Sequence, residues 1–520
     1  MIGTADRGGL ARSGVISLAG SAFAAIAALA LTLLIGNGLG ASGTGVFFQA
    51  VGIFTVLTQM LKLGTNSGII RELARQRAHD ERGGAWRTVL IALVPVVVVS
   101  VVVAVAVAVY ADVIAGWLGP ARQRDELTVL LGDLAPYLVV ASAMSVLQTA
   151  SRMVRGVGTF TLLQNVLLPA SRLIAAGAVL VLGWGALSAF RGWLLPLPVW
   201  LAATIVVVAV PLVRDVRDRS PGDAGWRRSS AAFWRFSAAR GVGAALETVF
   251  EWADVLLVAA LASPADAGVY AVVTRTVRAG QVVDRAMRIA AAPTISGLLA
   301  RGDVDAARTL HTRVARTMIL ATWPFYLVLA LSGAAVLQLF GPEFVRGAGV
   351  LAVLAAVTMI TTAAGMLQSI LLQGGRSSWQ VGNKAVAVVL IIGLNVLLLP
   401  SLGLLGAAIA WSAAVAADTV LAAWQVHRRM GVRLEPARLL SAAVPALVVF
   451  GAGGLVVRAL SGDAPIPAAL GSVALGLVYL AWLWLDRHRL GLDPVWALVL
   501  PRRGRPRQLP PGTPEAPPAL

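Results

Sequence analysis

Cysteine is absent from the 520 residues, and charged residues are scarce, at 13% of the chain. Without cysteine, disulfide bonds and thiol chemistry are excluded. Only two lysines occur, Lys62 and Lys384, and they follow Leu61 and Asn383 instead of the glycine that precedes the lysine of a phosphate-binding P-loop. The sequence therefore contains no nucleotide-hydrolysing P-loop.

Histidine is almost as rare. The four histidines, His79, His311, His427 and His488, lie far apart in the sequence and have no ligand partner at a metal-binding spacing. Each falls in or beside a segment predicted to be cytoplasmic, so we predict that they are solvated surface residues. We expect no metal site, no catalytic residues and no cofactor.

Apolar residues, by contrast, dominate the chain: 58% are hydrophobic and the mean hydropathy is +0.81. A bilayer core needs about 20 apolar residues per helical crossing, and such stretches recur from one end of the chain to the other. The sequence therefore predicts an all-α integral membrane protein with about 14 transmembrane helices. The predicted spans cover residues 14–35, 45–66, 88–110, 127–149, 160–182, 193–213, 237–262, 268–292, 317–340, 348–372, 385–400, 403–424, 439–457 and 466–485.

The formal net charge of +18 follows the predicted topology. Arginines concentrate before the first span, in every second loop and in the tail after residue 485, whereas the loops between them hold few. Because short cytoplasmic loops carry the excess of Lys and Arg, both termini are predicted to be cytoplasmic. The basic excess is explained by topology, and we expect no nucleic-acid partner.

An internal repeat divides the predicted helices. The segment Gly43–Phe48 (GTGVFF) opens the second span, and the similar Asp266–Ala271 (DAGVYA) opens the eighth. Such repeats are typical of transporters built from two equivalent bundles around a central site, and six spans per bundle make the two bundles parallel. We therefore predict two pseudo-symmetric six-helix bundles around a central cavity, followed by two further helices. The predicted parts are an N-terminal bundle 1–213, a basic cytoplasmic linker 214–236, a C-terminal bundle 237–427, helices 13 and 14 in 428–485, and a basic Pro-rich cytoplasmic tail 486–520.

Two predicted spans carry an unusual number of charges. In the seventh, Arg240, Glu247, Glu251 and Asp254 fall within a stripe about 60° wide on a helical wheel. The eighth carries Arg275, Arg278, Arg285 and Arg288 with Asp284, and the fifth carries Arg172. Charged side chains within a bilayer face protein or water and mark transport pathways.

These charges have two interpretations, which the sequence leaves open. The seventh and eighth spans run antiparallel, and each helix rises 1.5 Å per residue, so residues at equal depth in the membrane can be matched. This matching pairs Glu251 with Arg275 and Glu247 with Arg278, and in the first interpretation the carboxylates form structural salt bridges. Alternatively, the surplus arginines bind an anionic substrate by bidentate hydrogen bonds, while Glu247, Glu251 and Asp254 couple transport to a proton or cation gradient.

Several segments carry motifs of a known family: Leu63–Leu73, Trp252–Asp254, Ala267–Tyr270 with Arg275, Pro293–Asp303 and Leu394–Ala408. Through these motifs the chain resembles the polysaccharide-biosynthesis (Wzx-type) flippases of the multidrug/oligosaccharidyl-lipid/polysaccharide exporter superfamily. The resemblance spans nearly the whole chain. It implies two six-helix bundles with a cavity that opens alternately to either side of the membrane.

The resemblance also implies a function, a location and partners. Members of this family move undecaprenyl-(pyro)phosphate-linked oligosaccharides from the cytoplasmic to the outer leaflet of the bacterial inner membrane. The predicted substrate-binding residues are Arg172, Arg240, Arg275, Arg278, Arg285 and Arg288. Expected partners are the lipid-linked oligosaccharide, membrane lipids, and glycosyltransferases or a polymerase of the same pathway.

Three other functions fit the sequence less well. A cation-coupled multidrug exporter is disfavoured by a cavity richer in arginine than in carboxylate. Lipid II flippases carry cationic residues in the first span, and residues 14–35 contain none. A membrane-embedded glycan polymerase generally places reactive groups on a long outer loop, whereas the longest outer loop predicted here is 111–126, so we predict that the protein is not an enzyme.

Overall fold

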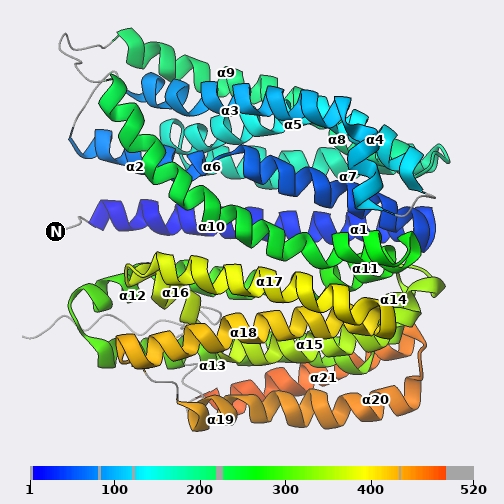
Figure 1. Cartoon of the computed structure of the whole chain (residues 1–520). Coiled ribbons are helices and arrows are strands. Elements are labelled where there is room, and N and C mark those ends of the chain that lie inside the picture. The colour runs from blue at the N-terminus through cyan, green and yellow to red at the C-terminus, as the bar shows by residue number, and fades with distance from the viewer. Residues whose placement is uncertain (1–3, 80–83, 120–122, 218–225, 433–434, 488–520) are drawn as a thin grey trace, which may run out of the picture.

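The computed structural model describes residues 4–79, 84–119, 123–217, 226–432 and 435–487. Every regular element in these ranges is helical, and most of the helices run along one common direction (Figure 1). The predicted all-α class is confirmed. We call the two ends of the molecule the N-terminal end, where α1 (Thr4–Leu61) begins, and the hairpin end, where α1 reverses direction.

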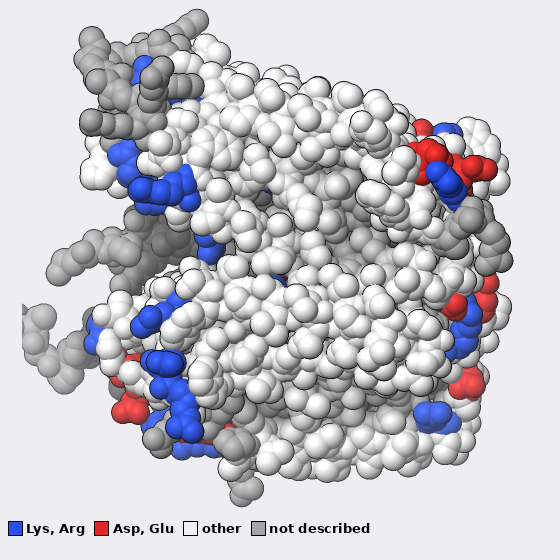
Figure 2. Space-filling view, viewed as in Figure 1, with Lys and Arg blue, Asp and Glu red and all other residues white. Residues whose placement is uncertain are grey.

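The helices form a band suited to a bilayer. Eleven helical stretches in the described ranges are long and apolar enough to cross a membrane. On the face shown in Figure 2, charged residues gather at the two ends and leave an almost uncharged band between them, as a hydrocarbon core requires. The chain is therefore a multi-pass membrane protein. The predicted count of fourteen spans is not confirmed, because α1 qualifies only once and the charge-bearing α10 (Trp226–Leu261), α11 (Pro264–Ala279) and α12 (Gln281–Ala300) do not qualify.

The first two predicted spans are the two limbs of α1. The chain reverses at Gly40, whose φ of 64° and ψ of −174° are accessible to glycine but not to L-residues with a side chain. A Cβ atom at this position would also lie 2.5 Å from Oε1 of Glu343. The hairpin is further held to the opposite half by Asn37, whose amide donates to the carbonyl oxygen of Leu339 at 2.8 Å.

The first half of the molecule lies in the upper part of Figure 1. Its centre is α5, because Leu127, Leu131, Leu134 and Leu138 recur at helical spacing and are at most 1% exposed. The helices α3 and α9 pack on α5. The bounds are α2 Thr65–Ala78, α3 Ala85–Val109, α4 Ala111–Leu118, α5 Arg124–Val154, α6 Val157–Thr161, the π-helical η2 Leu162–Leu167, α7 Leu168–Val181, α8 Ala186–Leu194 and α9 Pro196–Arg217.

The second half occupies the lower part of Figure 1 and ends in helices that pack on α13. Here α17 pairs with α18, α13 with α15, and α10 with α17, while α19 and α20 cover the outside of α13. The bounds are α13 Val304–Leu331, α14 Gly333–Gln338, η3 Pro342–Gly347, α15 Ala348–Ala363, α16 Leu367–Gln373, α17 Ser377–Leu402, α18 Leu404–Met430, α19 Pro436–Ala446, η4 Leu447–Ala452, α20 Gly453–Ser461 and α21 Pro465–Leu485.

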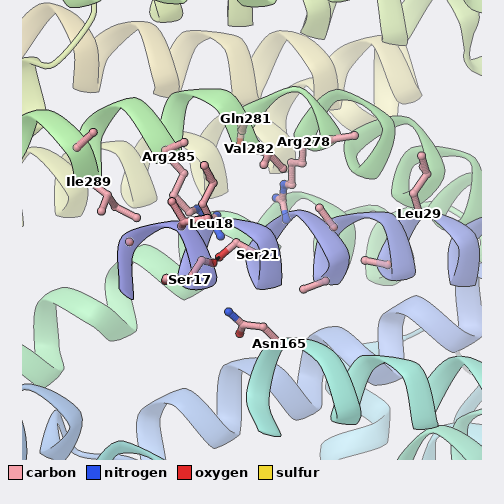
Figure 3. Close-up of a pocket in the computed structure, with 18 of the residues that line it drawn as sticks. Ser17, Leu18, Ser21, Leu29, Asn165, Arg278, Gln281, Val282, Arg285 and Ile289 are labelled. Atoms are coloured by element: carbon pink, nitrogen blue, oxygen red, sulfur yellow. Dashed lines mark hydrogen bonds between the residues drawn. The ribbon is translucent and has the colours of Figure 1, made fainter. Parts of the chain in front are cut away.

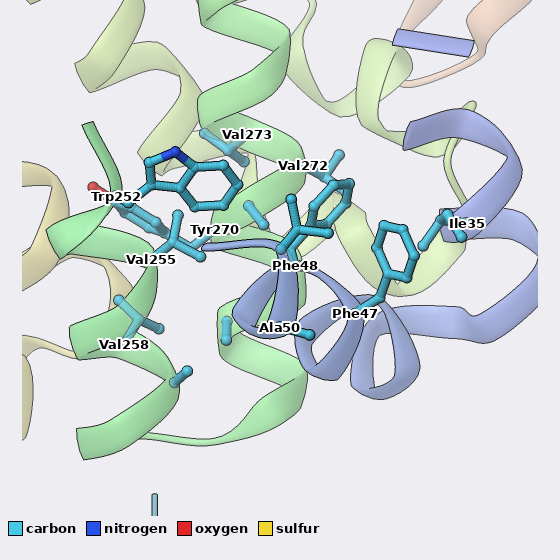
Figure 4. Close-up of a cluster of buried hydrophobic side chains, with 14 of the residues drawn as sticks. Ile35, Phe47, Phe48, Ala50, Trp252, Val255, Val258, Tyr270, Val272 and Val273 are labelled. Atoms are coloured by element: carbon cyan, nitrogen blue, oxygen red, sulfur yellow. The ribbon is translucent and has the colours of Figure 1, made fainter. Parts of the chain in front are cut away.

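The two halves meet along the second limb of α1, which packs against α11 and α10. Phe47 and Phe48 of α1 lie beside Val272 of α11 and near Trp252 of α10 in a buried apolar cluster (Figure 4). Burial of this cluster holds the halves together near the hairpin end. The contact line between the second limb of α1 and α11 is called the seam below.

The seam contains both segments of the predicted repeat. Gly45, in the first segment, packs against the backbone of Pro264 and Gly268, and Gly268, in the second, packs against Ala41 and Gly45. The contacts are reciprocal, as two related bundles require. The exact domain boundaries stay a prediction, and the tail after residue 487 lies outside the described residues.

Candidate functional site

A cavity of about 580 Å³ lies between the first limb of α1 and helices α11 and α12 (Figure 3). We call it the central cavity. The limb of α1 contributes small side chains such as Ser17 and Ser21, and Asn165 of η2 reaches in from the first half. Because the seam closes the hairpin end, the cavity lies on the N-terminal side of that closure.

Three arginines, Arg275, Arg278 and Arg285, line the opposite wall of the central cavity together with Gln281. No acidic side chain is found among the described residues of its lining. In Figure 3, Arg278 and Arg285 extend from α11 and α12 toward the first limb of α1. The cavity is therefore positively charged and suited to an anionic ligand.

Each arginine is held differently. The guanidinium carbon of Arg275 lies 4.1 Å from the ring centroid of Phe48 and 4.7 Å from that of Trp252, a double cation–π contact. Arg278 donates a hydrogen bond to the backbone carbonyl oxygen of Glu251. Arg285 is exposed and lines the cavity, so its guanidinium is the most available to a ligand.

A glycine sets the position of these arginines. Gly280 separates α11 from α12 and packs on α13, where a Cβ atom would lie 2.7 Å from Cδ1 of Phe325 and 2.7 Å from the hydroxyl of Tyr326. Any side chain here would push the start of α12 away from α13. The glycine thus fixes the offset between Arg278, before the break, and Arg285, after it.

A second cavity, of about 440 Å³, lies within the second half, and we call it the bundle cavity. Its walls come from α10, the end of α11, α12, α15, α16, α17 and α18. Arg278, Gln281 and Arg285 line both cavities and so form their shared wall. The charged residues that line the bundle cavity are Glu247, Glu251, Asp284, Asp418, Arg278, Arg285, Arg288 and Lys384.

The structure gathers most of the predicted site residues around these two cavities. Arg275, Arg278, Arg285, Arg288, Glu247 and Glu251 line one or both of them. Arg172, Arg240 and Asp254 line neither.

The three residues outside the cavities lie on α7 and α10. The guanidinium carbon of Arg172 on α7 lies 3.6 Å from the ring centroid of Trp193. Asp254 on α10 is fully buried, and its carboxylate accepts a hydrogen bond from the backbone N–H of Val255 at 2.8 Å. Arg240 is half-buried in the first half of α10.

The expected salt bridges are not found. Among the ion pairs within the described ranges, none involves Glu247 or Glu251. Arg275, the predicted partner of Glu251, instead lies between two aromatic rings, and the arginine that reaches Glu251 is Arg278, one helical turn further along. Depth matching assumes straight helices and a fixed loop, so an error of three residues in register is enough to exchange Arg275 for Arg278.

Two residues of the bundle cavity, Lys384 and Asp418, are not among the site residues predicted from the sequence. Lys384 was expected before a span beginning at residue 385, but α17 begins at Ser377, so Lys384 lies inside the helix. Its ammonium lies 2.9 Å from Oδ2 of Asp418 and 4.4 Å from the ring centroid of Phe250. The sequence does contain a signal for this pair: Asp418 is an acid within a predicted span and has no partner assigned by the sequence. Such an acid requires a cation on a neighbouring helix.

The prediction of four solvated histidines is wrong for His311. His79 and His427 are exposed, and His488 lies outside the described residues. His311 on α13 is 1% exposed, and neither ring nitrogen has a hydrogen-bond partner. Its helix extends the ninth span toward the N-terminal end, so a residue expected in a loop lies in the packed bundle.

Comparison with known proteins assigns the chain to a protein family. The family model described as polysaccharide biosynthesis protein matches residues 44–346. The probable low-salt glycan biosynthesis flippase Agl15 of Haloferax volcanii is 23% identical over 445 residues, which is 79% of this chain and 82% of that protein.

Solved structures share the fold at low sequence identity. The lipid II flippase MurJ in an inward closed conformation superposes with a TM-score of 0.66 at 10% identity, over 91% of this chain and 99% of that one. An inward-facing multidrug resistance MATE family transporter of the MOP superfamily superposes with a TM-score of 0.58 at 15% identity, over 84% of this chain and 98% of that one.

Proposed function

This chain belongs to the polysaccharide biosynthesis protein family. We propose that it is a flippase for lipid-linked oligosaccharides of the multidrug/oligosaccharidyl-lipid/polysaccharide exporter superfamily, with a solved member of which it shares the fold. The substrate would be an undecaprenyl-(pyro)phosphate-linked glycan that crosses from the inner to the outer leaflet by alternating access. The related Agl15 carries the description of a glycan biosynthesis flippase, which supports this assignment.

The observation that carries the proposal is the charge of the central cavity. Its lining has Arg275, Arg278 and Arg285 and, among described residues, no carboxylate. An arginine at the bilayer centre costs about 2.5 to 3.5 kcal/mol on the insertion scale, so three of them need an aqueous or anionic counterpart. Phosphate oxygens match the planar guanidinium fork in bidentate hydrogen bonds.

The phosphate contact is proposed for Arg278 and Arg285, which extend into the cavity. Arg275 adds positive charge from between its two aromatic rings. Arg288 faces only the bundle cavity, and Arg172 and Arg240 line neither, so their role in substrate binding rests on the sequence alone. Coupling to a proton or cation through Glu247, Glu251 or Asp254 is part of the same proposal.

The proposed orientation follows the arginine-rich loops. With both termini in the cytoplasm of a bacterial cell, the N-terminal end faces inward, the hairpin end faces outward, and this conformation receives substrate from the cytoplasmic leaflet. Glycosyltransferases or a polymerase of the same pathway would supply and consume the substrate.

The alternatives fit the site less well. A cationic drug would meet three arginines in the central cavity without a balancing carboxylate. A lipid II substrate fits a fold shared with MurJ, yet the first limb of α1 offers no cation between residues 14 and 35. A membrane-embedded glycan polymerase is disfavoured by the short outer loop predicted at residues 111–126.

The test is reconstitution in liposomes with a lipid-linked oligosaccharide and a reagent that modifies only glycans in the outer leaflet. Arg285→Ala should slow flipping about tenfold or more, since a hydrogen bond to a charged group contributes about 1.5 to 3 kcal/mol. Arg301→Ala, an exposed arginine just beyond the end of the same helix, is the matched control and should flip at the normal rate. Normal flipping by the Arg285 variant, or none by the parent protein, contradicts the proposal.

A further inference from the structure

The bundle cavity holds buried polar atoms that lack partners. Asp284 is 8% exposed; its Oδ2 accepts a hydrogen bond from the hydroxyl of Thr362 at 3.3 Å, but its Oδ1 has no partner. Asp418 is 7% exposed, and Lys384 engages Oδ2 while Oδ1 stays unpartnered. Because buried polar atoms are nearly always hydrogen-bonded, these oxygens call for donors that the protein itself does not supply.

Gln368 extends the same pattern on a different helix. Both its side-chain nitrogen and its side-chain oxygen are buried without a partner, and the residue lines the bundle cavity. The lining of the cavity therefore includes two carboxylates and one amide that each have a polar atom without a partner in the protein. A ligand that satisfies all of them must both donate and accept hydrogen bonds.

The charge of the bundle cavity selects the kind of ligand. Four acidic and four basic side chains line it, so it is formally neutral, whereas the charged residues described in the lining of the central cavity are all arginines. A phosphate is attracted to the central cavity. In the bundle cavity, a part of the substrate with a net charge of either sign would meet side chains of its own sign. A neutral polyhydroxyl ligand avoids both conflicts.

The remaining lining residues suit a sugar. Thr358, Thr361 and Thr419 supply hydroxyl groups, and Trp411 supplies an aromatic face on which the apolar side of a sugar ring can pack. Well-formed ligand sites combine such an apolar surface with a few directed polar groups.

The shared wall connects the two sites. A phosphate bound by Arg278 and Arg285 stands at the boundary of both cavities, because both residues line each of them. The sugar attached to that phosphate then has direct access to the bundle cavity. The lipid chain continues in the other direction, along Val15, Leu18 and Leu29 of α1 in the central cavity.

We infer that the bundle cavity is the glycan subsite and binds the sugars nearest the phosphate, while the central cavity holds the phosphate and the start of the lipid chain. This inference rests on the proposed function. It assigns Asp284, Gln368 and Asp418 to sugar recognition, which neither the sequence nor the family match indicates.

The test compares two ligands that differ only in the sugar: undecaprenyl pyrophosphate and the same lipid bearing a disaccharide. Binding of each to the purified full-length protein is measured for the parent and for Gln368→Leu, Thr361→Val and Arg285→Ala. Gln338→Leu, an exposed glutamine outside both cavities, is the matched control. Retained binding of the bare lipid shows in the same experiment that a variant is folded.

Gln368→Leu and Thr361→Val are expected to weaken binding of the glycosylated lipid about tenfold and to leave the bare lipid unaffected, whereas Arg285→Ala weakens both. If Gln368→Leu and Thr361→Val bind the glycosylated lipid as tightly as the parent protein does, the glycan subsite is overturned and the proposed function is not. An equal loss for both lipids in those two variants would also overturn it. A parent protein that binds neither lipid would overturn the proposed function and the subsite together.

Discussion

Gly45 and Gly268 lie against each other across the seam, at corresponding positions of the repeated segments. A Cβ atom on either glycine would lie 2.9 Å from the backbone nitrogen of the other. It would also overlap a carbonyl oxygen, that of Pro264 for Gly45 and that of Ala41 for Gly268. Small residues let helix backbones approach this closely in membranes, and the reciprocity is what two bundles related by an axis along the membrane normal produce.

Opening the hairpin end requires that this seam separate. Gly45→Ala should disfavour the closed seam and populate the open form about tenfold more, which corresponds to ~1.4 kcal/mol. Because the chain has no cysteine, Val272→Cys provides a single reactive thiol at a site that is fully buried while the seam is closed. The rate of its modification measures opening.

The matched control for the seam is Gly132→Ala, since a Cβ atom on that glycine meets nothing within 4 Å. Modification of the thiol should proceed at the parental rate in this variant. Equal rates in the Gly45 and Gly132 variants would show that the glycine contact does not govern closure.

Gly280→Ala should reduce flipping at least about tenfold without loss of folded protein, because displacement of α12 from α13 moves Arg285 relative to Arg278. Gly297→Ala lies on the same helix, where the nearest atom to a Cβ is the mobile end of Arg301 at 3.5 Å, and should be silent. Flipping rates in liposomes compare the two. Parental activity of the Gly280 variant would refute a positioning role.

The ion pair of Lys384 and Asp418 is largely buried, with side chains 16% and 10% exposed. Lys384→Met leaves a buried carboxylate without its partner, which costs about 3 to 5 kcal/mol, so the thermal unfolding midpoint should fall by several degrees. The double variant Lys384→Met with Asp418→Leu should recover much of the loss. Arg124→Ala, which breaks the exposed pair with Asp112, should change the midpoint little.

His311→Leu should leave the thermal midpoint unchanged or raise it. The imidazole is buried, and neither nitrogen has a hydrogen-bond partner, so leucine removes two unsatisfied polar atoms while it keeps an apolar contact surface. A fall of several degrees would instead indicate that the ring makes a stabilising interaction in the folded protein. His427→Leu, at an exposed position, serves as the control.

Hydropathy, charge and repetition predict much of this fold. The apolar stretches locate the helices, and the repeated segments containing Gly45 and Gly268 indicate the relationship of the two halves before their contact is known. Hydropathy cannot place helix ends that extend beyond the apolar core. It therefore missed that Lys384 and His311 lie within helices, since α17 and α13 begin before their apolar stretches.

The site is harder to predict than the fold, because charges on neighbouring helices can be matched only when the helix register is known. The arginines of α11 and α12 stand out in the sequence because a charged side chain in a bilayer costs free energy. That cost does not indicate which residues they contact. Arg275 lies between Phe48 and Trp252, and Phe48 belongs to the other half. No pattern in the eighth span indicates such a neighbour.

The wall that Arg278 and Arg285 share between the two cavities separates two kinds of specificity. If the lipid phosphate is recognised in the central cavity, beside α1, and the sugar in the bundle cavity, beside α15 to α18, then substitutions in one cavity leave recognition in the other intact. Relatives that export different glycans on the same lipid would then differ around the bundle cavity and agree around the central one. A change of cargo would need only a few substitutions in one half of the protein.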